Sequence, residues 1–406
     1  MSFEVTINDP ALPVAGLKLA ATASGLRYKN RDDLCLIAIP ADATTHGVYT
    51  TNRFCAAPVI VARRHEVSAV PRFLIINAGN ANAGTGERGV AAALEVCRAV
   101  ARHGGCAQDE VLPYSTGVIG QQLDSARIAE CVPALFAGLT EDAWPRAAGA
   151  ILTTDTRAKL RSATVSCGAQ RFTVTGMTKG SGMIKPNMAT MLAYVATDAA
   201  ITHPVLSELA TRAAMRSFNR ITVDGDTSTN DALVLIATGA AGNPSPTSVD
   251  DELGQALLAG FEMVCGELAR DIVRDGEGAT KFVTLHVHGG YSDEDCARVA
   301  YAVAESPLVK TALFASDANW GRILAAVGRA GAARLDIEDV AIDIGPCPIV
   351  RAGQPVAGYD EAAVTAVIKQ ADIEIDIVIG RGAHETTVWT CDFSYDYVKI
   401  NAEYRS

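Results

Sequence analysis

A glycine-rich stretch at residues 178–192, TKGSGMIKPNMATML, holds the residues whose types and spacing are best suited to chemistry. Gly180 and Gly182 allow backbone dihedrals that other residues avoid. Pro186 stops a helix from continuing through the stretch, because proline lacks the backbone N–H that a helix needs. These features alone are also typical of a glycine-rich surface loop, so the chemistry depends on the residues beside them.

The residues beside these glycines are compatible with self-cleavage. Ala189 places a small side chain before Thr190, which leaves its carbonyl open to attack by the threonine hydroxyl. Attack on a strained peptide bond gives an ester, and water then releases Thr190 with a free amine. That amine can act as the general base for its own hydroxyl. Lys179 supplies a cation for a substrate carboxylate or for developing negative charge, and Ser181 beside it is the alternative nucleophile.

A second glycine pattern, Gly84-x-Gly86-x-x-Gly89, matches a dinucleotide-binding fingerprint and follows a predicted strand at 73–77. The predicted helix at 89–100 does not open inside this motif, and the loop at 78–83 is too long for a tight strand-to-helix turn. We therefore interpret the glycines as requirements of the loop backbone. A non-enzymatic protein that binds a nucleotide or another small molecule on its two glycine-rich loops remains the alternative.

Two other patterns are suggestive of metal binding but do not complete a site. The loop DGDTSTND at 224–231 is similar to a calcium loop, yet Thr229 and Leu235 occupy the positions that need glycine and glutamate. His286 and His288 share one face of a predicted strand, and no third ligand lies nearby in sequence. The ten cysteines form no C-x-x-C pair, which favours reduced structural thiols. We expect no metal.

The composition is that of a soluble globular protein. The chain has 406 residues, of which 49% are hydrophobic and 20% charged, and this length favours two or more subdomains. Its N-terminus, MSFEVTINDP, lacks the basic and then apolar pattern of a secretory signal. The most apolar stretch, at 232–241, is about half of the ~20 residues that a membrane span needs. A cytoplasmic location is therefore expected.

The net charge of −11 argues against a general nucleic-acid-binding protein. This charge is unevenly distributed along the chain. Residues 1–189 hold 19 basic and 15 acidic residues, a net charge of +4, whereas residues 190–406 hold 16 and 31, a net charge of −15. A solvated acidic surface explains the excess, and opposite net charges would also help two separated pieces to stay associated.

The secondary-structure pattern predicts an α+β fold with layered sheets. Strands are predicted at 73–77, 171–175, 191–197, 231–237, 281–288, 340–344 and 373–379, and helices at 89–100 and 205–218. The glycine-rich stretch at 176–186 is expected to lie between the second and third of these strands. Because strands and helices do not alternate in regular βαβ order, we favour layered sheets over a doubly wound sheet.

The chain resembles the ornithine acetyltransferase (glutamate N-acetyltransferase) family in several blocks. KGSGMIKPNMATML at 179–192 looks like the family's self-cleavage signature, with Ala189–Thr190 as the cleaved bond. Other blocks follow in the family's order: NAGNANAG at 77–84, STGVIG at 115–120, TTDT at 153–156, SFNRITVDGDTSTND at 217–231, DGEGATK at 275–281, SDANWGR at 316–322 and NAEYRS at 401–406. Because these blocks span nearly the whole chain, the resemblance favours self-cleavage over a surface loop.

This resemblance implies a fold and a processing pattern. The fold would be an αββα sandwich with an additional C-terminal α/β subdomain. Cleavage would give an N-terminal alpha chain, residues 1–189, and a C-terminal beta chain, residues 190–406, that begins with the nucleophile. The fragments would stay together, and two such pairs would form a heterotetramer, although the sequence does not fix that count.

The resemblance also implies an activity, namely acetyl transfer from N-alpha-acetylornithine to glutamate in arginine biosynthesis. Thr190 would carry the acetyl group, and the oxyanion would be stabilised by the hydroxyl of Thr116 and the backbone N–H of Gly117. Substrate contacts are assigned to Thr153, Lys179, Thr190, Glu277, Asn401 and Ser406. Because two threonines are adjacent, Thr154 competes with Thr153 for this role.

No cofactor is implied, and no residue decides whether acetyl-CoA also serves as an acetyl donor. The alternative within the same architecture is an N-terminal-nucleophile aminopeptidase or amidohydrolase, in which water replaces glutamate as the acceptor. The partners implied are small amino-acid substrates and the chain's own fragments, with no nucleic acid and no membrane.

Overall fold

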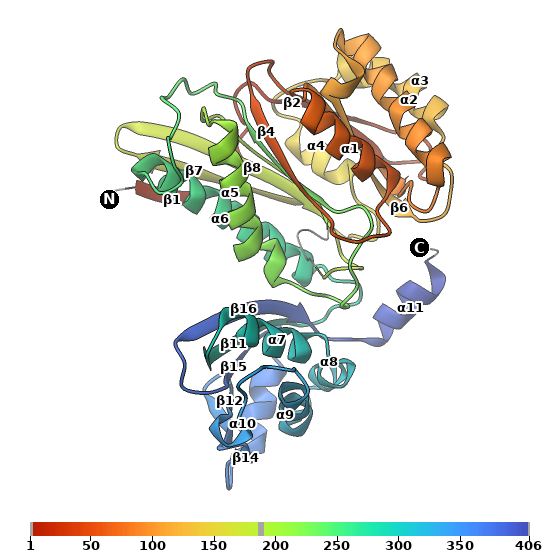
Figure 1. Ribbon diagram of the computed structural model, residues 1–406. Coiled ribbons are helices and arrows are strands. Elements are labelled where there is room, and N and C mark those ends of the chain that lie inside the picture. Colours follow the sequence, from red (N-terminus) through yellow and green to blue (C-terminus); the bar gives the residue numbers. More distant parts are fainter. Residues whose placement is uncertain (1–2, 186–190, 405–406) are drawn as a thin grey trace.

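The computed structural model describes residues 3–185 and 191–404, and it places their strands in three sheets (Figure 1). The first sheet has six strands in the order β1-β7-β8-β9-β10-β4. In that order they are Phe3–Asn8, Lys159–Cys167, Gln170–Lys179, Leu192–Thr197, Ala232–Ala237 and Thr44–Tyr49. The second sheet has four strands in the order β2-β3-β5-β6, which are Lys18–Thr22, Leu34–Ala38, Phe73–Asn80 and Val111–Val118.

These two sheets pack face to face, and helices cover their outer faces. The core between them joins Leu74 and Tyr114 of the second sheet to Tyr194 and Val234 of the first. Helices α5 (His203–Arg216) and α6 (Glu252–Arg274) cover the first sheet, and α2 (Gly86–Gly104) and α3 (Ser125–Ala137) cover the second. Helices α1 (Ala57–Ser68) and α4 (Trp144–Ala150) contribute side chains to the core between the sheets. The predicted α+β class and αββα sandwich are confirmed.

The third sheet belongs to a separate C-terminal subdomain with its own hydrophobic core. Its strands, in the order β14-β13-β12-β15-β11-β16, are Gln354–Pro355, Cys347–Arg351, Ala341–Ile344, Asp372–Val378, Phe282–Gly290 and His384–Cys391. Its helices are α7 (Asp293–Ala304), α8 (Pro307–Phe314), α9 (Trp320–Gly328) and α10 (Glu361–Ile368). The chain ends in α11 (Tyr395–Glu403), which extends from this subdomain back toward the sandwich (Figure 1).

Strand β8 is longer than the sequence predicts. We expected its end near Thr175 and a glycine-rich connection from Gly176, but β8 continues to Lys179. Pairing on both edges carries it further, because Gly176 lies opposite Arg161 of β7 and Val195 of β9. A Cβ at Gly176 would lie 2.8 Å from the Val195 side chain, so glycine here permits close packing rather than ending the strand.

The first sheet contains strands from both sides of the predicted cleavage point. Among the described residues, β1, β4, β7 and β8 precede residue 189, whereas β9 and β10 follow residue 190. β9 pairs antiparallel with β8 and parallel with β10, and β10 pairs antiparallel with β4. The division of the chain at 189/190 is therefore not a division between folded units, and it stays a prediction about processing.

Three findings bear on the composition-based expectations. None of the helices within residues 3–185 and 191–404 is long and apolar enough to cross a membrane. All ten cysteines lie in the described part of the chain, and each is a free thiol. Within the same residues, no group of three or more His, Cys, Asp or Glu side chains is arranged to hold a metal ion.

Strands β5 and β6 approach each other very closely where they end. Gly79 and Gly117 are parallel neighbours, and Gly117 has φ +131°, which disfavours side chains. A Cβ at Gly117 would lie 2.3 Å from the carbonyl carbon of Gly79 and 2.5 Å from the backbone N of Asn80. Glycine at position 117 is thus required by the pairing itself, and this fixes the backbone at the carboxyl end of β6.

We expect Gly117→Ala to destabilise the fold more than Gly120→Ala. Gly120 has a positive φ of +83°, but, its chain neighbours aside, no atom of the described residues lies within 4 Å of the methyl group that alanine would add. This variant therefore isolates the backbone cost of about 1–2 kcal/mol. Gly117→Ala should add an overpacking cost of about 1–3 kcal/mol. Chemical denaturation of both variants measures the difference in free energy of unfolding, and equal losses would contradict the close approach of β5 and β6.

Candidate active site

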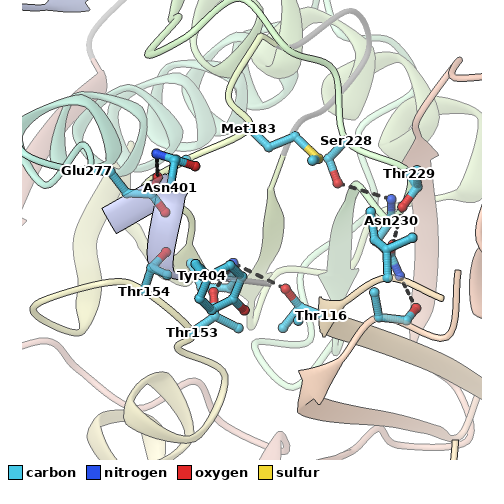
Figure 2. A pocket seen from close by; sticks show the side chains of 15 residues that line it. Thr116, Thr153, Thr154, Met183, Ser228, Thr229, Asn230, Glu277, Asn401 and Tyr404 are labelled. Atoms are coloured by element: carbon cyan, nitrogen blue, oxygen red, sulfur yellow. Dashed lines mark hydrogen bonds between the residues drawn. The ribbon is translucent and has the colours of Figure 1, made fainter. Parts of the chain in front are cut away.

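Six residues selected from the sequence line one pocket, although they come from five separate segments of the chain. They are Thr116, Gly117, Thr153, Lys179, Glu277 and Asn401. The other described lining residues are Ala81, Ile119, Thr154, Gly182, Met183, Ser228, Thr229, Asn230 and Tyr404. In Figure 2, Glu277 and Asn401 face Asn230 across the opening, with Thr116 and Thr153 below and Met183 above. The fold thus brings the described candidates together.

Lys179, the last residue of β8, lies between two threonine hydroxyls. Its Nζ donates to Oγ1 of Thr153 at 2.8 Å and to Oγ1 of Thr116 at 3.2 Å. Because the ammonium donates to both oxygens, the two hydroxyl hydrogens are left for other acceptors. Thr116 therefore has the bond pattern of a group that can donate a hydrogen bond to an oxyanion.

A neighbouring carboxylate favours the charged form of Lys179. Burial lowers the pKa of Lys179, and the Asp155 carboxylate, 4.0 Å away, opposes that effect. Burial alone would raise the pKa of Asp155, but the ammonium groups of Lys179 and Lys159 and the N–H of Gly180 hold this pKa at about 2. Asp155 is consequently ionised throughout the neutral range.

The opposite side of the pocket carries an anion, Glu277, from the loop after α6. Its carboxylate accepts a hydrogen bond from Nδ2 of Asn401 at 2.8 Å, and its backbone N donates to the carbonyl of Ser181 at 2.8 Å. A Cβ at Gly182 would lie 2.4 Å from the Glu277 carboxylate, so the glycine-rich stretch passes directly beside this acid. One pocket therefore presents both a cation and an anion.

The C-terminal helix α11 forms part of the pocket wall. Ser394 caps α11 by accepting from the N–H of Asp396 and also donates to the carbonyl of Gly278 at 2.6 Å. A Cβ at Gly278 would lie 2.5 Å from the backbone N of Tyr397, which shows how closely the helix covers this loop. At its end, Tyr404 lies 5.5 Å from the guanidinium of Arg27. The chain's C-terminal helix thus brings Asn401 into the pocket with the other candidates.

The loop at 222–231 fixes the stretch that precedes the predicted cleavage point. The Asp224 carboxylate accepts hydrogen bonds from the N–H of Met183 at 2.6 Å and of Ile184 at 2.9 Å. Thr222 and Thr227 donate to the carbonyls of Ile184 and Lys185, at 3.0 and 3.1 Å. Met183 has φ +55°, an uncommon value for a residue with a side chain. Side chains of this loop also accept from its own backbone, at the N–H groups of Gly225, Asp226 and Asn230.

Two residues directly before β10, Asn230 and Asp231, were not selected from the sequence as active-site residues. Nδ2 of Asn230 donates to the carbonyls of Ala81 and Ser115, at 2.6 and 2.9 Å, and so joins the two sheets beside the pocket. Asp231 is buried and shares an adjoining hollow with Thr116 and Lys179. Burial raises its pKa well above the usual value, and its Oδ2 has no hydrogen-bond partner among the described residues. Both belong to the 217–231 block, whose length was the available signal.

The dinucleotide-like glycine pattern differs from our prediction in one respect. β5 continues to Asn80 and α2 begins at Gly86, so the helix does open inside the motif. Pairing with β6 extends the strand and shortens the loop. The position above Gly89 is filled, since a Cβ there would lie 1.9 Å from Oγ1 of Thr85 and 2.6 Å from Oδ1 of Asn82. Glycine at position 89 thus permits close packing of the first turn of α2 against the loop before it.

The remaining candidates have these positions. Ala189, Thr190 and Ser406 lie outside the described residues, so their roles stay predictions. Ser181, the alternative nucleophile, is buried, and its hydroxyl pairs with the Thr154 hydroxyl at 2.8 Å. Nδ1 of His286 lies 2.9 Å from the Thr387 hydroxyl, which gives this histidine a structural partner. Thr153 contacts Lys179 directly, whereas Thr154 contacts Ser181, so Thr153 is the threonine connected to the cation.

Comparisons with known proteins agree with this geometry. The chain is 52% identical over 402 residues to the arginine biosynthesis bifunctional protein ArgJ of Psychrobacter arcticus, covering 99% of both chains. It is 49% identical over 394 residues to the protein of that name from Pseudomonas fluorescens, covering 97% of both. The crystal structure of ArgJ from Bacillus halodurans matches with 40% identity and a TM-score of 0.50, over 52% of this chain and 98% of that one. The ArgJ family model matches residues 18–406, and the chain therefore belongs to the ArgJ family.

Proposed function

We propose that this chain cleaves itself between Ala189 and Thr190 and then uses Thr190 to carry an acetyl group from N-alpha-acetylornithine to glutamate. The observation that carries this proposal is the convergence of Thr116, Lys179 and Glu277 on one pocket from separate segments of the chain. Membership of the ArgJ family supports the reaction, since the relatives are named as bifunctional proteins of arginine biosynthesis.

The position of the cleaved bond in the chain supports its part in the site. Lys179 of β8 and Leu192 of β9 are cross-strand neighbours, so the connection at 180–191 has both ends fixed at one place. On one side of the bond, Gly182 and Met183 line the pocket. On the other side, Met191, the residue bonded to Thr190, shares the adjoining hollow with Thr116 and Lys179. Both described flanks thus border the reactive groups.

In the first half-reaction, the hydroxyl oxygen of Thr190 attacks the acetamide carbonyl while the Thr190 amine accepts the hydroxyl proton. The oxyanion receives hydrogen bonds from the Thr116 hydroxyl and the Gly117 backbone N–H. Because Lys179 donates to the Thr116 oxygen, it polarises this hydroxyl toward donation. The C–N bond then breaks, ornithine leaves with the proton, and Thr190 is left as an acetyl ester.

In the second half-reaction, the amine of glutamate attacks the ester carbonyl of acetyl-Thr190. The same two donors stabilise the oxyanion, and removal of one such donor typically costs ~10²–10³ in rate. The C–O bond breaks, Thr190 recovers its proton, and N-acetylglutamate leaves. Each substrate is an amino acid, so Lys179 suits a carboxylate and Glu277 suits the side-chain ammonium of ornithine.

The assembly that we propose contains two alpha and two beta chains. The fragments of one chain would stay together, because β9 and β10 lie between β8 and β4 in a single sheet. The opposite net charges of residues 1–189 and 190–406, +4 and −15, add a weak long-range attraction. Pairing of two cleaved chains is the remaining step to a heterotetramer.

We further propose that acetyl-CoA serves as a second acetyl donor for glutamate. The word bifunctional in the relatives' shared name supports two activities. Both donors would deliver the same acetyl group to Thr190, so the second half-reaction would be unchanged. No other cofactor enters the scheme.

Thr190→Ala is expected to block both cleavage and acetyl transfer, because the hydroxyl is the nucleophile in each. Denaturing electrophoresis and N-terminal sequencing should show two fragments for the wild-type chain, with Thr190 at a new N-terminus, and one uncut chain for the variant. Ser181→Ala is the matched control, and it should still be cleaved and active. Active wild-type protein that remains a single uncut chain would exclude the cleavage.

The cleaved protein is expected to elute from a size-exclusion column as one species that contains both fragments, with about twice the mass of one chain. The fragments should separate only in denaturant, since their separation requires the first sheet to open. Raising the salt concentration is the control, because it screens the charge attraction but leaves the shared sheet. Fragments that separate under native conditions would contradict the shared-sheet argument.

Acetyl release from N-alpha-acetylornithine is expected to depend on glutamate and to yield N-acetylglutamate in equal amount. Release that is independent of glutamate, with no acetylglutamate, would instead indicate an amidohydrolase in which water is the acceptor. Replacing acetylornithine by acetyl-CoA in the same assay tests the second donor. Formation of N-acetylglutamate from acetyl-CoA is the expected result, and its absence would limit the enzyme to recycling the acetyl group.

A further inference from the structure

Three buried charged residues next to the pocket have no role in the scheme above. Lys159, the first residue of β7, donates from Nζ to Oδ1 of Asp155 at 2.6 Å and to Oδ2 of Asp275 at 2.5 Å. The side chains of Lys159 and Asp155 are 0% exposed, and that of Asp275 is 3% exposed. Asp155 and Asp275 belong to the TTDT and DGEGATK blocks, so both blocks supply a buried acid as well as a candidate substrate contact.

The Asp155 carboxylate connects this cluster to the pocket. Its Oδ1 accepts from Lys159 and from the backbone N of Gly180 at 2.7 Å. Its Oδ2 accepts from the backbone N of Thr153 at 3.1 Å and lies 4.0 Å from Nζ of Lys179. One carboxylate thus sets the position of the Thr153 backbone, of the turn after β8 and of the Lys179 ammonium.

The Asp155 carboxylate faces two ammonium groups, and Lys159 is the nearer of them. Lys159 is bonded to Oδ1 at 2.6 Å, whereas Lys179 lies 4.0 Å from Oδ2 and makes its two hydrogen bonds to Thr153 and Thr116. Without Lys159, Lys179 would be the remaining ammonium beside Asp155, and a closer ion pair would draw it away from Thr116. The cluster of Asp155, Asp275, Lys159 and Lys179 is neutral as a whole, so loss of one cation also leaves a buried negative charge.

We propose that Lys159 and Asp155 are positioning residues for acetyl transfer, which keep Lys179 charged and bonded to the hydroxyls of Thr116 and Thr153. This inference rests on the proposed function, in that Lys179 must polarise Thr116 during the reaction. Neither residue touches substrate. Lys159 acts on Asp155, and Asp155 acts on Lys179.

The charges around Lys179 give this arrangement a distinctive pH dependence. Burial lowers the pKa of Lys179, Asp155 raises it, Lys159 lowers it, and the more distant Asp231 and Glu277 raise it. Activity that needs the charged form of Lys179 is lost as pH rises through this pKa. Removing Asp155 lowers the pKa of Lys179 further, whereas removing Lys159 raises it. The two substitutions therefore move the alkaline limit of activity in opposite directions.

The test uses cleaved, purified enzyme and measures kcat and KM for acetylornithine and glutamate as a function of pH. Asp155→Asn is expected to move the alkaline limit of kcat to lower pH, and Lys159→Met to higher pH. Both should lower kcat at neutral pH by up to about 10²-fold, the typical effect of a misplacement of about 1 Å. Shifts in the same direction, or no shift in either variant, would overturn the inference.

A double variant separates positioning from charge balance and covers the case in which Lys159→Met does not fold. Lys159→Met with Asp275→Asn removes one cation and one anion, so the cluster stays neutral. We expect this protein to fold and cleave, with a thermal midpoint above that of Lys159→Met, but to retain a low kcat and the raised alkaline limit. Recovery of wild-type kcat and pH profile would show that Lys159 only balances charge. A wild-type enzyme without transferase activity would instead reject the proposed function, and this inference with it.

Discussion

A buried ammonium group needs a partner charge, and the site of this protein is organised around one such group. Transfer of an ion from water into a protein interior costs several kcal/mol even after relaxation, unless paired charges and hydrogen bonds compensate. Lys179 is placed at the end of β8, between the two sheets, and is compensated by Asp155 and by two threonine hydroxyls. Asp155 is in turn buried, and its compensation comes from Lys159 and two backbone N–H groups. The geometry of the pocket follows from this chain of requirements.

The glycines of the site allow the backbone segments that carry these charged groups to approach one another closely. At Gly117 and Gly182 a side chain would collide with the Gly79 backbone and with the Glu277 carboxylate, respectively. Glycine at position 117 permits the close approach of β5 and β6 beside Thr116, and glycine at position 182 leaves room for the Glu277 carboxylate to lie beside Asn401. Close backbone approach and charge compensation are therefore parts of one arrangement.

Local pattern was sufficient for the α+β class but not for the ends of its elements, and the αββα arrangement was implied by the family resemblance. Periodicity and β-branched residues placed β5, β9, β10, β12 and β15 to within a few residues, because the side chains that identify these strands are also those that pack. The ends of β5 and β8 were missed, since pairing with neighbouring strands carries both past the local signal. The start of α2 at Gly86 was missed for the same reason, as the loop before it is shortened by the longer strand.

The sequence blocks that resemble the family identified which residues line the pocket. They did not identify the buried residues that hold these in position. Thr153 and Glu277 were selected, whereas Asp155 and Asp275, two residues away from each in the same blocks, were not. A buried acid and an exposed acid look alike in sequence, because burial is decided by the fold as a whole. Here Lys159 lies four residues from Asp155 but 116 residues from Asp275, and it pairs with both. Likewise Asn230, beside the first sheet, donates to the carbonyls of Ala81 and Ser115 beside the second sheet. These contacts span more than a hundred residues, and no local spacing predicts them.

The C-terminal subdomain contributes to the site by supporting both the Glu277 loop and the tail. Asp392, after β16, accepts from the N–H groups of Thr280 and Lys281 at 2.8 and 2.9 Å, which fixes the segment that follows Glu277. Ser394, two residues further on, begins α11 and holds Gly278. The acid and the amide that pairs with it, Asn401, are thus anchored by one short stretch of chain. Because α11 has no buried residue of its own, its position depends on these anchors, and so the anionic side of the pocket depends on the docked subdomain rather than on the sandwich alone.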